Sequence, residues 1–180
     1  DDLGYITACP TNLGTGLRIS VMVHLPTLVS TKQIDKVTRA AQQTGLVVRG
    51  LYGEGTAAHG DFFQISNQVT LGRSETEVVE TVSDVVGMII EWERRVRNLL
   101  VAEEGLAMTS RVRESFDALV LAPPLTFDDA MRHLSTLRLG LHLGVMALPK
   151  LSVLNELFLL TQPAHMVLFR GASKDADSRD

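Results

Sequence analysis

The chain has 180 residues, of which 45% are apolar and 21% charged, and this composition excludes an intrinsically disordered segment. Its formal net charge of −4 excludes a diffuse basic surface, so we expect neither nucleic acid nor a membrane as partner. A single cysteine excludes a disulfide framework and a Cys-rich zinc site, and it predicts a cytoplasmic protein. The five histidines lack the spacing of metal ligands, so no metal site is predicted from them.

Strands and one helix are predicted in the first part of the chain. Leu17–Leu25 alternates apolar and polar side chains with a period of two, which is typical of a half-buried strand. A helix is predicted over about residues 31–44, because hydroxyl side chains can cap its start and a glycine follows its end. Leu46–Tyr52 and Phe62–Ser66 predict a hairpin around the glycine-rich loop Gly53–Gly60, which we expect to be mobile.

Helices are predicted in the remainder of the chain. Ser74 and Glu77 form a capping box that opens a long helix ending near Gly105. Thr126 is predicted to cap a later helix, with Asp129 three residues further on. Shorter helices are predicted over about residues 109–121 and 152–161, and residues 164–169 are predicted to form one more short turn. Because strands come early and helices late, with no linker between them, the chain is predicted to have an α+β fold.

Arg18 and Arg49 are candidate anion ligands. Arg18 lies on the predicted strand face opposite Ile19 and Val21, and Arg49 lies beside Gly50. A planar guanidinium next to a glycine-rich turn can bind a phosphate through two parallel hydrogen bonds. Either arginine alone fits better as a solvated side chain on a sheet surface, whereas the two together favour an anion site.

Three further features each allow a structural and a functional interpretation. Asn12–Gly16 contains two glycines, but it lacks the Lys-Ser/Thr pair of a P-loop and the third glycine of a dinucleotide fingerprint. An ordinary turn is therefore the simpler interpretation of that stretch. Cys9 fits either a small buried thiol or a thiolate stabilised by Arg18. Glu54, in the predicted loop, fits a solvated acid.

The segment Cys9–Arg18, CPTNLGTGLR, resembles in order and spacing the signature of the ATP:guanido phosphotransferases, or guanidino kinases. Other segments resemble this family in register. They are Val48–Gly50, Phe63–Asn67, Leu71–Gly72, Arg138–Gly140, Leu154–Leu157 and Thr161–Pro163. The resemblance therefore covers nearly the whole chain.

Within this family, the bacterial protein-arginine kinases are more similar to the chain than the creatine or arginine phosphagen kinases. The loop Arg49–Gly55 is similar to the protein-arginine kinase version, whereas the phosphagen kinases carry a Gly-Gly pair and a later Asp there. Met22 stands where the phosphagen kinases have an adenine-stacking histidine, and Gln64 stands where they have Asp. These departures favour a protein substrate over a free guanidine.

The resemblance implies an antiparallel sheet flanked by helices, as in the guanido kinase, glutamine synthetase-like catalytic domain. Residues 1–170 would be the C-terminal part of that domain, with its first strands missing. Residues 171–180 would be a charged tail, in which Arg179 and Asp180 begin a truncated phosphoarginine-binding motif used for allosteric activation. Because the family's principal catalytic glutamate precedes the Cys-Pro motif, we expect it to be absent here and this fragment to be inactive alone.

The resemblance also implies a function, the ATP-dependent phosphorylation of arginine side chains in proteins, with ATP and Mg²⁺ as cofactors. Glu54 and Cys9 would be the catalytic residues, both close to the incoming guanidinium. Arg18 and Arg49 would bind the phosphates. The residues implied to line the ATP site are Arg18, Ile19, Ser20, Val21, Met22, Arg49, Gly50, Leu51, Tyr52, Gly53 and Glu54.

Two alternative functions remain open. One is a small-molecule guanidino kinase of the arginine or creatine type, and the other is a non-catalytic module that binds a nucleotide or phosphoarginine. For the first interpretation, the family implies protein substrates bearing arginine, an activator protein, a heat-shock repressor and a Clp protease as partners. It also implies a role in stress response and protein quality control, and it is compatible with a homodimer of the full-length parent.

Overall fold

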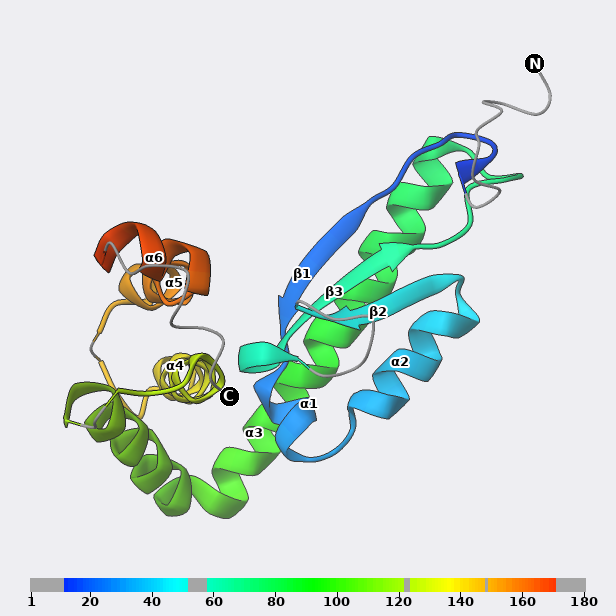
Figure 1. The fold of residues 1–180 in the computed structure, drawn as a ribbon. Coiled ribbons are helices and arrows are strands. Elements are labelled where there is room, and N and C mark those ends of the chain that lie inside the picture. Colours follow the sequence, from blue (N-terminus) through cyan, green and yellow to red (C-terminus); the bar gives the residue numbers. More distant parts are fainter. Residues whose placement is uncertain (1–11, 52–57, 122–123, 148, 171–180) are drawn as a thin grey trace. The chain divides into compact units, whose positions relative to one another are not determined.

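The structure is a computed structural model that describes residues 12–51, 58–121, 124–147 and 149–170 (Figure 1). The chain forms two compact units, residues 1–100 and residues 101–180. The predicted boundaries at 1–170 and 171–180 stay a prediction, because the tail lies outside the described residues. The helix α3, Glu75–Leu121, contributes to both units.

The break predicted near Gly105 lies at Glu104, where the backbone leaves helical geometry with φ −127° and ψ 23°. Helical geometry resumes after this residue, so α3 consists of two helices joined across a kink. The predicted end of the long helix near Gly105 and the further helix that follows it are therefore confirmed.

Three strands form the sheet of the first unit. They are β1 Ser20–His24, β2 Leu46–Gly50 and β3 Phe62–Asn67, and their order is β1-β3-β2 with both pairs antiparallel. All three predicted strands and the hairpin between the second and third are confirmed. The register places Met22 and Arg49 on either side of Gln64, so these three side chains share one face of the sheet.

The opposite face of the sheet is apolar and packs against helices. Figure 1 shows α3 running along this sheet, with α2, Ile34–Gln43, beside β2. Strand residues such as Val23, Val48 and Ile65 are buried, and for Val23 the alternation in the sequence predicts this burial. The helices contribute Val37, Ala41, Val82, Val85, Val86, Ile89 and Val96 to the same core. An antiparallel sheet flanked by helices confirms the predicted α+β fold class.

A buried carboxylate connects α3 to a short helix that the sequence did not predict. This helix, α1, covers Pro26–Ser30 directly after β1, and no side chain of its own caps it. Glu93 of α3 accepts hydrogen bonds from the main-chain N–H groups of Thr27 at 3.1 Å and Leu28 at 3.0 Å, and from the Thr27 hydroxyl. Arg97 donates to the same carboxylate at 3.2 Å. Glu93, only 2% exposed, therefore supplies the N-terminal cap that α1 lacks.

The predicted capping box of α3 is confirmed. Ser74 donates its main-chain N–H and its hydroxyl to Glu77 at 2.7 and 2.8 Å, and the Glu77 N–H donates back to the Ser74 hydroxyl at 3.3 Å. These bonds, first the one from the main-chain N–H, hold the pKa of the Glu77 carboxyl below its usual value. The first turn of α3 thus begins at the residue that the sequence indicates.

The second unit is helical in its described part. It contains α4 Phe127–His142, α5 Leu151–Leu160 and α6 Pro163–Arg170 after the end of α3. The predicted cap of α4 is confirmed, because the Thr126 hydroxyl accepts a hydrogen bond from the Asp129 N–H. Among the described residues, no helix combines the length and hydrophobicity needed to cross a membrane.

We predict that Glu93→Ala lowers the free energy of unfolding by about 3–5 kcal/mol, because it leaves Arg97 and the first turn of α1 without their buried partner. Trp92, the single tryptophan of the chain, packs against the same core, so its fluorescence during denaturant titration reports on this unit. Glu91→Ala, at an exposed position of α3, is the matched control and should change stability by less than about 0.5 kcal/mol. Equal losses in the two variants would contradict the prediction.

Candidate functional site

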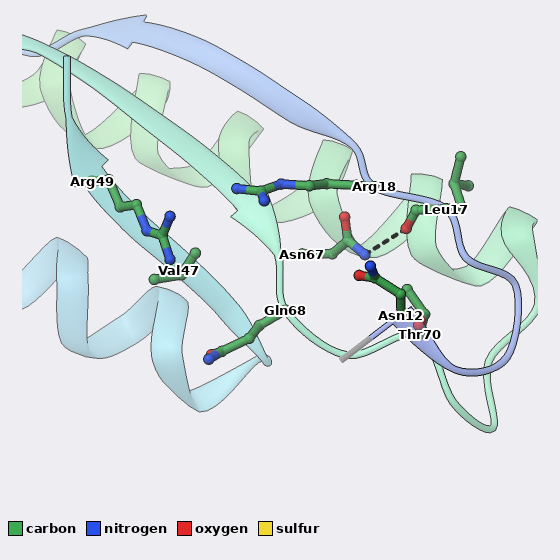
Figure 2. A pocket seen from close by; sticks show the side chains of 8 residues that line it. All are labelled: Asn12, Leu17, Arg18, Val47, Arg49, Asn67, Gln68 and Thr70. Carbon is green, nitrogen blue, oxygen red and sulfur yellow. Dashed lines mark hydrogen bonds between the residues drawn. The ribbon is translucent and has the colours of Figure 1, made fainter. Parts of the chain in front are cut away.

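A hollow of about 120 Å³ lies at one end of the sheet, on the side that the core does not cover. Its lining combines two cations, polar side chains and two apolar residues. The lining residues are Asn12, Leu17, Arg18, Val47, Arg49, Asn67, Gln68 and Thr70 (Figure 2). They come from the loop before β1, from β2, and from the end of β3 and the segment that follows it.

Arg18 and Arg49 supply the charge of this hollow. Arg18 lies two residues before the start of β1, and Arg49 lies within β2. Because β3 is the central strand, it lies between the two arginines. Both side chains are exposed, and neither forms an ion pair or hydrogen bond with another residue in the described ranges. Among the residues that the structure describes, no carboxylate lines the hollow. Two guanidinium groups in one concave site can bind a phosphate-bearing ligand through charge-assisted hydrogen bonds.

Gly14 allows the loop before β1 to approach the segment after β3. Its φ is +96°, and a Cβ at this position would lie 2.6 Å from the carbonyl oxygen of Thr70 and 2.9 Å from the Cα of Leu71. The Thr70 hydroxyl also donates to the carbonyl oxygen of Leu13 at 2.5 Å. The lack of a side chain at Gly14 therefore permits this close contact between the two segments.

Asn67 joins the end of β3 to the backbone on both sides of Arg18. Its side-chain oxygen accepts a hydrogen bond from the Ile19 N–H at 2.7 Å, and its side-chain nitrogen donates to the Leu17 carbonyl oxygen at 2.9 Å. Figure 2 shows the second of these bonds. Both polar atoms of this buried amide are thus satisfied by a segment about 50 residues away in the sequence.

The predicted site residues on β1 and β2 divide between the two faces of the sheet. The side chains of Ile19 and Val21 pack against the core, so only the backbone of these two residues can contact a ligand on the opposite face of the sheet. Ser20 and Met22 are exposed on the face of Arg18, with Met22 at 48%. Gly50 is buried and Leu51 partly buried. Cys9, Tyr52, Gly53, Glu54, Arg179 and Asp180 lie outside the described residues, and the functional roles of all these positions stay predictions.

Several lining residues were not singled out as site residues in the sequence. They are Asn12, Leu17, Val47, Asn67, Gln68 and Thr70. A signal existed for two of them, because Asn12 lies in the glycine-rich signature and Asn67 ends a segment that resembles the family. No periodicity argument could have found Gln68 or Thr70, since they follow the strand and their position depends on tertiary packing.

The lining suits the phosphate end of ATP better than it suits Mg²⁺. Arginine guanidinium groups match phosphate oxygens, while Mg²⁺ prefers carboxylate, phosphate and water oxygens. Within the described ranges, no three His, Cys, Asp or Glu side chains converge into a possible metal site. In this part of the chain, the phosphates of ATP would therefore be the main ligands of a Mg²⁺ ion.

A cationic hollow beside an antiparallel sheet is typical of a protein that binds a phosphate-bearing ligand. The chain belongs to the family of ATP:guanido phosphotransferases, because residues 1–96 match the family described as the ATP:guanido phosphotransferase C-terminal catalytic domain. Residues 105–180 match the family described as the protein-arginine kinase McsB C-terminal domain. The resemblance drawn from the sequence is thereby confirmed over both halves of the chain.

The curated relatives of the chain agree with this assignment. The chain is 47% identical over 177 residues to a protein-arginine kinase of Halalkalibacterium halodurans, a match that covers 98% of this chain and 50% of the relative. It is 44% identical over 177 residues to a protein-arginine kinase of Bacillus subtilis, covering 98% and 49% respectively. Among solved structures, lombricine kinase matches 57% of this chain and 26% of its own, with 43% identity and a TM-score of 0.44. The chain spans about half the length of the curated relatives it matches.

We predict that Gly14→Ala destabilises the first unit more than Gly72→Ala does, by about 1–3 kcal/mol. Both glycines have positive φ, so both variants introduce backbone strain, but a Cβ at Gly72 meets nothing within 4 Å. Only the first variant also forces a methyl group against Thr70. Denaturant unfolding followed by Trp92 fluorescence measures the difference in the free energy of unfolding. Equal losses of stability in the two variants would contradict the prediction, because the close approach at Gly14 would then not affect stability.

Proposed function

We propose that the full-length protein transfers the terminal phosphoryl group of ATP to arginine side chains of proteins. The observation that carries the proposal is the pair Arg18 and Arg49, two guanidinium groups that line one hollow with no partner among the described residues. The protein-arginine kinase relatives support the choice of a protein-bound acceptor over a free guanidine.

The described residues would bind and orient the phosphates. Phosphoryl transfer needs an in-line arrangement of nucleophile and leaving group, together with positive charge on the transferred phosphate. Arg18 and Arg49 would hold the phosphates from two strands of one sheet, so their spacing is fixed by backbone hydrogen bonds. Mg²⁺ bound to ATP would neutralise part of the phosphate charge. Because the arginines make no ion pair with the described residues, binding would not require such a pair to be broken.

The acceptor side of the site is proposed from the resemblance. A guanidinium is protonated at neutral pH and must lose a proton as it attacks, which requires a carboxylate nearby. Glu54 would offer such a carboxylate, and the Cys9 thiolate would lie close to the same guanidinium. For both residues the role stays a proposal.

The cellular setting is proposed on the same basis. A single cysteine fits a reducing cytoplasm, and the family implies protein substrates, an activator protein, a heat-shock repressor and a Clp protease as partners. Stress response and protein quality control would follow from those partners. Phosphoarginine binding near Arg179 and Asp180 would activate the full-length protein allosterically.

We predict that Arg18→Ala and Arg49→Ala in the full-length protein each weaken ATP binding about 10- to 100-fold, because each removes charge-assisted hydrogen bonds to phosphate. Isothermal titration with ATP and Mg²⁺ measures the dissociation constants. Arg39→Ala, at an exposed position of α2 away from the hollow, is the control and should bind as the wild type. Unchanged affinity in both test variants would remove the phosphate-binding role.

We predict that the full-length protein phosphorylates an unfolded, arginine-containing protein and leaves free arginine and creatine unmodified. Radiolabelled ATP distinguishes the acceptors, because phosphoarginine is acid-labile whereas phosphoserine is not. Preferential labelling of a free guanidine would support the small-molecule kinase instead. Nucleotide binding without any transfer would support the non-catalytic module.

A further inference from the structure

The antiparallel ladder between β1 and β3 continues beyond its last regular pair through a side chain. The register pairs Ser20 with Ser66, so its continuation pairs Ile19 with Asn67. The Asn67 N–H donates to the Ile19 carbonyl oxygen at 3.3 Å, as a regular ladder requires. The Ile19 N–H, however, donates to the Asn67 side-chain oxygen at 2.7 Å. A side chain thus replaces a main-chain acceptor at this point.

The next rung of the ladder shows the same replacement. Two residues before Ile19, the carbonyl oxygen of Leu17 would face the N–H of Val69 in a regular ladder. It accepts a hydrogen bond from the Asn67 side-chain nitrogen at 2.9 Å instead. The amide of Asn67 therefore extends the pairing of β1 backwards to Leu17, past the point where the two backbones stop pairing regularly.

The backbone of the segment after β3 follows β2 rather than β1. The Gln68 N–H donates to the carbonyl oxygen of Gly45, the residue before β2, at 3.1 Å, and the next residue, Val69, is 49% exposed. The two backbones therefore separate directly after Asn67. The hollow is lined by Leu17 and Arg18 on one side and by Gln68 on the other, and Figure 2 shows the Asn67 side chain between them.

We propose that Asn67 is a positioning residue that sets the direction of Arg18 into the phosphate site. Its two side-chain hydrogen bonds hold the residues directly before and after Arg18, so the backbone of Arg18 is fixed although it has no regular strand partner. A side-chain amide supplies an acceptor and a donor, and here these two groups bond to the residues on the two sides of Arg18. Because Arg18 makes no ion pair with the described residues, the backbone is its principal constraint. This proposal rests on the proposed function, in which Arg18 binds phosphate.

Asn67→Ala tests the proposal in the full-length protein. We expect it to raise the dissociation constant for ATP about tenfold, because two buried hydrogen bonds that orient Arg18 are lost. Asn67→Leu approximately keeps the side-chain volume and removes both hydrogen bonds without adding charge to the hollow. It serves as the second variant, with the same expected loss of affinity, if the alanine variant does not fold. Thr27→Val is the matched control, because it removes a buried hydroxyl from a hydrogen bond to Glu93 in the same unit but outside the hollow. It should lower stability and leave the affinity within twofold of the wild type.

A double-mutant cycle separates positioning from a purely structural role. If Asn67 acts through Arg18, the effect of Asn67→Ala on ATP affinity disappears in an Arg18→Ala background and persists in an Arg49→Ala background. An equal effect in both backgrounds, or an affinity within twofold of the wild type in a folded Asn67 variant, would overturn the proposal and leave the proposed function standing. Wild-type affinity in Arg18→Ala and Arg49→Ala would instead overturn both.

Discussion

The buried carboxylate of Glu93 connects the helix α3 to the start of α1, and through α1 to the end of β1. A lone carboxylate in an apolar core is strongly unfavourable, and this one is stabilised because it accepts hydrogen bonds from the start of α1 and from Arg97. Since α1 directly follows β1, the carboxylate fixes the end of that strand against α3. The same helix α3 contributes side chains to the core on the apolar face of the sheet. The position of the strand and the packing of the core therefore depend on the same helix.

The two faces of the sheet differ in polarity and in exposure to water. On one face, apolar strand residues and helices exclude water, and this burial supplies the free energy that holds the strands in register. On the other face, Arg18 and Arg49 remain exposed without a carboxylate between them in the described part of the chain. Water screens the repulsion between the two cations, so the arrangement costs little in the free protein. In the proposed function, an incoming phosphate would replace that water and be attracted by both cations.

The sequence predicted the parts of this fold that follow from local patterns, and it missed those that depend on distant partners. Period-two alternation identified the first strand, β-branched and aromatic residues identified the second, and a short apolar run identified the third. Capping residues located the starts of α3 and α4. The helix α1 has only five residues, and its cap comes from Glu93, more than 60 positions away, so no local signal predicts it. For the site, the two arginines were identified from their type and setting. The lining residues after β3 were not, because their position follows from where the strand leaves the ladder.

Side chains from elsewhere in the sequence hold both ends of β1. Glu93 acts at the end that leads into α1, and Asn67 acts at the end that carries Arg18. Glu93 accepts hydrogen bonds from the first turn of α1, which has no cap of its own. Asn67 bonds to the backbone before β1 where β3 no longer pairs with it. These bonds let the chain leave regular geometry at each end of the strand. The position of Arg18 therefore depends on tertiary packing rather than on strand propensity. A perturbation of the core that shifts β3 against β1 should consequently reach the proposed phosphate site through the Asn67 amide before the sheet itself is lost.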